Sequence, residues 1–146
     1  SQKYPFIEKI KKDSKHFYIL TGSYSQFEKG KNFCLLPHQS GFYFPDLIKT
    51  ADGVVGKVGY GTVAEVWASQ KPFMSIFRKD FRESQPIRKF IDENIPGFEV
   101  SHQIFNDGEW INDIDRFLNI KEKKNGIPVT NGSDQAFNII NNWFAS

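Results

Sequence analysis

The apolar residues of this chain fall into short continuous runs, and stretches with helical spacing separate these runs. Each run predicts a buried strand. The predicted strands are His16–Leu20, Phe33–Leu36, Asp52–Gly56, Pro72–Phe77 and Phe98–Ile104. Where apolar residues recur every three or four positions, the pattern predicts a helix. The predicted helices are Tyr4–Lys12, Pro45–Ala51, Thr62–Ser69, Gln85–Asn94, Gly108–Leu118 and Ser133–Ala145.

Continuous apolar strands that alternate with helices are typical of a parallel sheet covered on both faces. We therefore predict an α/β fold, a Rossmann-like parallel sheet with helices on both faces. Such sheets bind ligands outside the carboxyl ends of their strands. The loops that would lie at this edge are Thr21–Asn32, Pro37–Phe44, Lys57–Thr62 and Arg78–Gln85.

Composition limits the classes of protein to consider. The length of 146 residues is that of a single domain, and the net charge of +2 carries no nucleic-acid footprint. Five lysines near the amino end predict a solvated helix face, with a patch for peripheral membrane association as the alternative. The single cysteine, Cys34, cannot form an internal disulfide, so we expect a reduced, cytoplasmic setting. The three histidines lack metal-ligand spacing, so no metal site is predicted.

The densest run of small residues is GKVGYGTVAE, residues 56–65. An ATP-type phosphate loop needs Ser or Thr after its Gly-Lys pair, and Val58 stands there instead. Gly59, Gly61 and Ala64 match the dinucleotide pattern GxGxxA, and Asp80 could serve as its acidic partner. However, this turn follows the third predicted strand, whereas the dinucleotide fingerprint belongs after the first.

In a third interpretation the turn still binds phosphate, but the phosphate belongs to a nucleotide sugar. A helix that starts at Thr62 would direct unpaired N–H groups and its positive dipole end over the turn. Gly59 and Gly61 would leave room for the diphosphate of a nucleotide sugar. Thr62 and Glu65 also form a capping box, T-x-x-E, in which the glutamate closes the helix start. Glu65 can therefore serve the helix, a ligand, or both.

The stretch ADGVVGKVGYGTVAEVWASQKPFMSIFR, residues 51–78, resembles the carboxyl-terminal domain of GT-B fold glycosyltransferases of family 28. It is also similar to the glycosyltransferase-like region before the kinase domain of plant-type L-arabinokinases. The shared pattern is AD-x-x-x-GK-x-GYGT-x-x-E, then a strand that begins with proline, then an arginine, and then a loop with Glu and Pro. The resemblance runs from Pro45 onward and covers about two-thirds of the chain.

The resemblance implies a role for each part of the turn. Gly59, Tyr60, Gly61 and Thr62 would face the diphosphate, and Glu65 would hold the ribose hydroxyls. The Pro37–Phe44 loop would lie against the base. Within that loop His38 and Phe42 are candidates for base contacts, against the alternatives of an ordinary loop histidine and of aromatic residues that seal the sheet end.

Residues after the next strand would complete the site. Arg78, at a strand end, is a candidate for a phosphate contact. The resemblance places Glu83 and Gln85 at the sugar, although Ser84 separates two residues that relatives often carry as an adjacent pair.

From these observations we expect a single domain, residues 1–146, that binds a nucleotide-diphosphate sugar, UDP-linked, for a glycosyltransferase that needs no metal. The nucleotide sugar is the donor substrate, so no cofactor is expected. The chain would be a fragment that lacks the first strand and the amino-terminal acceptor domain, and it would be inactive without that half or a partner chain. The alternatives are a dinucleotide-binding oxidoreductase domain and a non-catalytic regulatory or interaction module.

Overall fold

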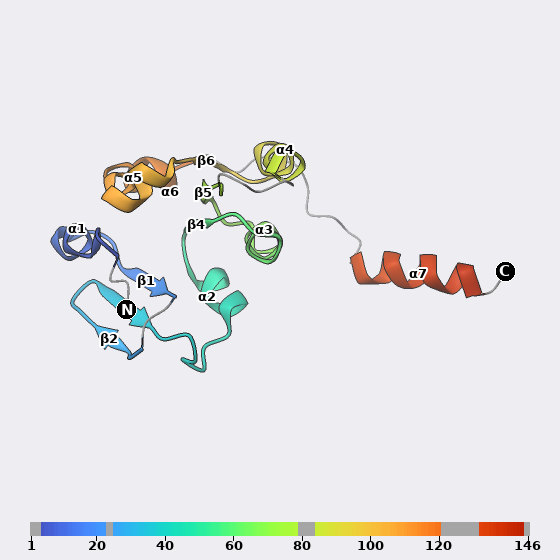
Figure 1. The fold of residues 1–146 in the computed structure, drawn as a ribbon, viewed down its shortest axis with the longest axis horizontal. Helices are drawn as coiled ribbons and strands as arrows, with labels where there is room; N and C mark the ends of the chain where they lie inside the picture. The colour runs from blue at the N-terminus through green and yellow to red at the C-terminus, as the bar shows by residue number, and fades with distance from the viewer. Residues whose placement is uncertain (1–3, 23–24, 79–83, 121–131, 145–146) are drawn as a thin grey trace.

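The computed structural model describes residues 4–22, 25–78, 84–120 and 132–144, and Figure 1 shows their course. The strands are β1 (Tyr18–Thr21), β2 (Glu28–Lys29), β3 (Phe33–Leu36), β4 (Val54–Lys57), β5 (Phe73–Ile76) and β6 (Gly97–Glu99). The helices are α1 (Ile7–Lys12), α2 (Phe44–Thr50), α3 (Tyr60–Ala68), α4 (Ser84–Asn94), α5 (His102–Asp107), α6 (Ile114–Leu118) and α7 (Gly132–Phe144). A 3₁₀ turn, η1 (Glu109–Asp113), precedes α6.

In the described residues the strands form two sheets of three strands each. Sheet A has the order β1-β3-β2, in which β1 and β3 are parallel and β2 is antiparallel to β3. Sheet B has the order β4-β5-β6 and is parallel throughout. The prediction of a Rossmann-like parallel sheet flanked by helices is confirmed in sheet B. The division into two sheets was not predicted.

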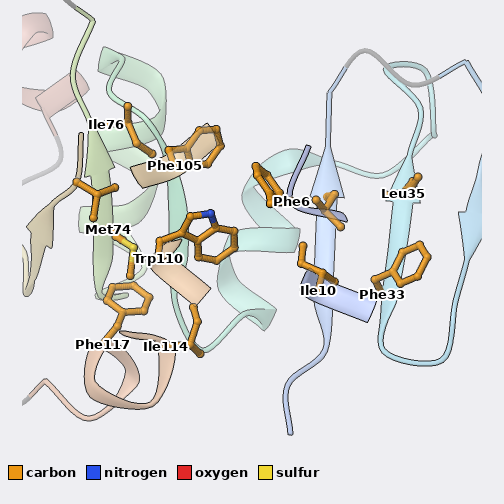
Figure 2. Close-up of a cluster of buried hydrophobic side chains, with 12 residues drawn as sticks. Phe6, Ile10, Phe33, Leu35, Met74, Ile76, Phe105, Trp110, Ile114 and Phe117 are labelled. Carbon is orange, nitrogen blue, oxygen red and sulfur yellow. The ribbon is translucent and has the colours of Figure 1, made fainter. Parts of the chain in front are cut away.

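Sheet B is covered on both faces, because side chains of β5 alternate between two apolar clusters. Met74 and Ile76 belong to the first cluster, which also contains side chains of α1, β1, β3, α5, η1 and α6 (Figure 2). Phe73 belongs to the second cluster, which contains side chains of α2, α3 and α4. Since all four residues of β5 are buried, this strand is the centre of the molecule.

Sequence pattern misplaced two elements around sheet B. The strand predicted for Phe98–Ile104 stops at Glu99, and α5 begins at His102. The Ser101 hydroxyl accepts a hydrogen bond from the Ile104 N–H at 3.2 Å, which is a helix cap that overrides the apolar run. The helix predicted for Gly108–Leu118 is instead η1 followed by α6.

The helix predicted for Ser133–Ala145 is present as α7, and every described side chain in it is exposed. Trp143 has the helical spacing of a core residue, yet it is 83% exposed. The apolar side chains of α7 are therefore exposed to solvent. None of the described helices combines the length and the apolar character that crossing a bilayer requires.

Candidate functional site

The candidate site lies where β4 turns into α3, at the carboxyl end of the strands of sheet B. The turn is short. It is attached to the end of β5, because the N–H of buried Val58 donates to the carbonyl of Ile76 at 2.9 Å. Gly59 then takes an extended conformation with φ −158° and ψ 152° and precedes the helix. Its carbonyl accepts the N–H of Val63 at 2.9 Å, which closes the first helical turn.

The helix therefore starts earlier than predicted. Its first residue is Tyr60, and its N-cap is Gly59 instead of Thr62. The capping box of Thr62 and Glu65 is not formed, because Thr62 is the third helical residue and no side chain caps this end. Glycine is an accepted N-cap, so the helix can begin without a side-chain oxygen. The prediction that Glu65 caps the helix is therefore wrong. Its contact with a ligand stays a prediction.

The glycines of this turn are not required by the fold. A Cβ atom added at Gly59 or Gly61 would meet no atom within 4 Å, and neither residue has positive φ. At Gly97, by contrast, φ is +141° and a Cβ would overlap the Phe73 carbonyl. Neither packing nor backbone conformation explains why glycine stands at positions 59 and 61. The remaining explanation is that the absence of a side chain keeps the space next to the turn open.

The start of α3 also carries polar groups without partners in the described part of the chain. The backbone N–H groups of Gly61 and Thr62 lie in the first turn, where a helix offers no acceptor. No described residue donates a hydrogen bond to the half-buried Glu65 carboxylate, which lies one turn further along the helix. The exposed Lys57 ends β4, directly before this turn. Hydrogen-bond donors and one carboxylate thus flank Gly59 and Gly61 along the chain.

Arg78 follows β5 at the same edge of sheet B, because Lys57 and Ile76 are register partners at the ends of adjacent parallel strands. The arginine is exposed, and no described carboxylate lies within 4.0 Å of its charged group. The segment that carries it is fixed, since the His102 ring contacts the Phe77 carbonyl through Nε2 at 2.7 Å. A second cation, Arg88, lies over the Phe77 ring at 4.0 Å and pairs with Glu99.

His102 and Arg88 are the supporting residues that sequence reasoning did not identify. His102 was expected in a strand and is the first residue of α5, from which its ring reaches the carboxyl end of β5. The N-cap residue Ser101 was the available signal. For Arg88 no sequence signal existed, because its partner Phe77 lies directly after β5 and its partner Glu99 lies on β6.

The loop after β3 contributes exposed aromatic residues. His38 is exposed, and Phe42 and Tyr43 are 60% and 68% exposed. They do not seal the sheet end, so that alternative was wrong for these side chains. Because α2 leads into the amino end of β4, its start at Phe44 lies toward the carboxyl ends of the strands, as does the loop. This loop and the turn therefore border the same side of the molecule.

Of the remaining predicted residues, only Gln85 lies within the described part of the chain. Gln85 is exposed and is the second residue of that helix, which follows β5. Glu83, assigned to the sugar, and Asp80, the acidic partner in the dinucleotide alternative, lie outside the described residues. Within the described ranges, no group of three or more His, Cys, Asp or Glu side chains is arranged to hold a metal ion.

At the opposite end of the strands, a polar cluster has its partners inside the protein. The Asp13 carboxylate accepts hydrogen bonds from the Tyr18 hydroxyl, from the His16 ring at 2.8 Å and from the Lys15 N–H at 2.8 Å. Although partial burial acts to raise it, these hydrogen bonds hold the pKa of Asp13 at about 2. The Asn32 amide group donates to the carbonyls of Ile10 and Asp13, both at 2.6 Å.

Comparison with known proteins identifies a relative. The chain is 29% identical over 122 residues to an L-arabinokinase of Arabidopsis thaliana. This match covers 84% of the chain and 11% of the relative, so the chain spans about a tenth of that protein's length. No family model and no solved structure matches the chain. The comparison supports a relation to the arabinokinase. It does not identify a specific glycosyltransferase family.

Proposed function

We propose that the β4–α3 turn binds the diphosphate of a nucleotide sugar, UDP-linked, as the donor-binding half of a glycosyltransferase. The observation that carries the proposal is the pair Gly59 and Gly61, which border open space although the fold does not need glycine there. A diphosphate in that space would accept hydrogen bonds from the first-turn N–H groups of α3 and would meet the positive end of the helix dipole.

Residues on either side of the turn are assigned to the other parts of the nucleotide sugar. The exposed Arg78 and Lys57 supply positive charge for the phosphates at two adjacent strand ends. The Glu65 carboxylate, which does not cap the helix, is available to accept hydrogen bonds from ribose hydroxyls. The exposed Phe42 and His38 lie in the loop that would border the base, and Gln85 opens α4 on the sugar side.

The similarity to L-arabinokinase supports sugar-related nucleotide chemistry and no finer assignment. In the proposed enzyme, the helix start of α3 stabilises the leaving diphosphate as its negative charge grows. The acceptor site and the catalytic base would come from a second half, either in the same protein or in a partner chain. The 146-residue chain alone is therefore expected to bind the donor and to transfer no sugar.

The decisive experiment is a set of calorimetric titrations with UDP, UDP-N-acetylglucosamine, UDP-glucose, GDP-mannose and NADH. We expect UDP and at least one UDP-sugar to bind, with NADH giving no heat. The natural full-length protein is titrated beside the 146-residue chain, so that an incomplete fold is not mistaken for the absence of a site. NADH binding without a response to any sugar nucleotide would establish the dinucleotide alternative. A full-length protein that binds none of the five would refute the proposal and favour a non-catalytic module.

A further inference from the structure

The helix α7 carries an apolar stripe that is exposed to solvent. Phe137, Ile140 and Phe144 recur at intervals of three and four residues, so they share one face of the helix. Each of these three side chains is more than half exposed. A helix of 13 residues is only marginally stable in water, and most helices are stabilised by packing an apolar face. The stripe of α7 is therefore a surface suited to packing against a partner.

The polar side of α7 indicates what kind of partner it fits. It consists of uncharged Asn, Gln and Ser side chains and one acidic residue, Asp134, in the first turn. Helices that bind membrane surfaces carry lysine and arginine on this side, and α7 has neither. A single charge also gives little selectivity for a strongly charged partner. We therefore expect α7 to pack against an apolar protein surface.

Sheet A offers an apolar face on the side away from the first apolar cluster. Leu20 of β1 belongs to that cluster, so Ile19, the residue before it, points to the opposite face of the sheet. Ile19 is the register partner of Cys34 on β3, so Cys34 lies on the same opposite face. Ile19 is 42% exposed, and Cys34 is half-buried. This face of sheet A is therefore apolar and partly open.

Two aromatic side chains extend this face. Phe17 lies directly before β1 and two positions before Ile19, which puts it on the same side. Lys29 of β2 is the register partner of Cys34, so Phe27, two positions before Lys29, is also on this side. Both phenylalanines are more than half exposed. We call Phe17, Ile19, Phe27 and Cys34 the open face of sheet A.

The stripe of α7 and the open face of sheet A suit each other. A helix that packs its apolar stripe on an apolar sheet face is the basic layer arrangement of α/β proteins. Within one copy the two surfaces lie apart, because Figure 1 shows α7 beyond α4, on the far side of the molecule from β1 and β2. A projecting helix can reach the same face on a neighbouring copy, and such an exchange between two copies is reciprocal.

The area of a reciprocal exchange is that of a stable interface. Each surface has two phenylalanines and an isoleucine as its main exposed apolar side chains, so each contributes roughly 400 Å². Two symmetric contacts then bury roughly 1,600 Å² in total, which is the standard size of a specific protein interface. One contact alone buries about half of that area, which is typical of weak association. The reciprocal arrangement is therefore favoured over a one-sided contact.

We propose that this chain forms a two-fold symmetric dimer in which α7 of each copy packs its apolar stripe on the open face of sheet A of the other copy. The partner that this surface fits is thus a second copy of the same chain. The residues involved are separate from those of the β4–α3 turn, so the inference does not depend on the proposed ligand.

Sedimentation equilibrium tests the dimer in the 146-residue chain and in the natural full-length protein. Ile140→Asp in α7 and Phe27→Asp on the open face should each weaken dimerisation at least about 100-fold, because each buries an unpaired charge. Both side chains are exposed, so we expect both variants to fold, and circular dichroism checks this. Asn142→Asp, on the polar side of α7, is the matched control and should dimerise like the parent. A parent protein that stays monomeric at about 100 μM would overturn the proposal.

A mixture of the two variants distinguishes helix exchange from other modes of dimerisation. The Phe27→Asp copy keeps an intact α7, and the Ile140→Asp copy keeps an intact open face. We therefore expect the mixture to form a 1:1 heterodimer through one contact, although each variant alone is monomeric. A mixture without heterodimer would indicate that like surfaces pair with each other, or that α7 binds a different partner. Either result would overturn the proposal.

Cross-linking through Cys34 gives a direct readout of the contact. Cys34 is the single cysteine of the chain and lies on the open face. Ala136→Cys adds a second thiol beside the stripe of α7, and a short bismaleimide should then link it to Cys34 of another copy. We expect a covalent dimer on a denaturing gel, and this product should be lost when Cys34→Ser is added. A link within one copy, or a dimer that persists without Cys34, would contradict the exchange.

Discussion

The two ends of the parallel strands use polar groups and glycines in opposite ways. At the amino ends, Asp13, His16, Tyr18 and Asn32 satisfy one another or backbone carbonyls. At the carboxyl ends, the backbone N–H groups of Gly61 and Thr62 and the charges of Glu65 and Arg78 have no partner in the described residues. Polar groups that the fold does not use remain available for a ligand.

Glycines follow the same division. Gly53 and Gly97, at the amino ends of β4 and β6, are packed against other parts of the chain, so that a Cβ would collide with Phe117 and with the Phe73 carbonyl, respectively. Gly59 and Gly61, after the carboxyl end of β4, border open space. The comparison shows that a glycine can be a packing requirement at one end of a sheet and a clearance at the other.

The largest expected effect is on stability at the amino end. Gly97→Ala places a Cβ against the Phe73 carbonyl at φ +141°, so we expect the free energy of unfolding to fall by about 3 kcal/mol. Urea unfolding followed by tryptophan fluorescence measures the change. Gly59→Ala is the matched substitution at the other end and should change stability by less than about 1 kcal/mol. Similar losses in the two variants would remove the distinction between the two kinds of glycine.

The second effect is on binding at the carboxyl end. Gly61→Val fills the space over the start of α3, so UDP affinity should fall at least tenfold, or about 1.4 kcal/mol. Unfolding free energy should stay within about 1 kcal/mol of the parent, because Val is a slightly better helix former than Gly. Gly132→Val, at the exposed start of α7, controls for the substitution and should leave UDP affinity unchanged. Unchanged UDP binding in Gly61→Val would refute the role of the turn.

The third effect is a pH dependence that belongs to the amino end alone. Because the pKa of Asp13 is lowered from 3.8 to about 2, its carboxylate stabilises the fold above about pH 4, and this contribution is lost as pH falls toward 2. Asp13→Asn should lower neutral-pH stability by about 1 to 2 kcal/mol and flatten the acid limb of the stability curve. Asp107→Asn, an exposed residue of α5, is the control. UDP affinity at neutral pH should not respond to either substitution.

The smallest expected effect separates the two roles considered for Glu65. Since Glu65 does not cap α3, Glu65→Gln should leave unfolding free energy within about 0.5 kcal/mol. Loss of the charged acceptor should weaken UDP binding about threefold to tenfold. Glu109→Gln in η1 is the matched control. A loss of about 1 kcal/mol in stability with unchanged UDP affinity would show instead that Glu65 serves the helix.

Much of the architecture was readable from local pattern. Continuous apolar runs located β1, β3, β4 and β5. The physical reason is clearest in β5, whose four residues are all buried, because a strand covered on both faces favours apolar residues at successive positions. The spacing of glycines in the sequence was enough to point to the β4–α3 turn. Local pattern failed at His102–Asp107, where the Ser101 cap determines the helix, and at Thr62, because Gly59 serves as the N-cap three residues earlier.

The amino-acid sequence by itself determined the alternation of strands and helices and the segment that holds the candidate site, since both depend on spacing and composition within a few residues. Tertiary structure alone decided which glycines border open space and which neighbours satisfy Asp13. It also decided that the described strands form two separate sheets, with β1 and β4 each at one edge. These facts depend on atoms brought together from distant parts of the chain, and no local pattern records that proximity.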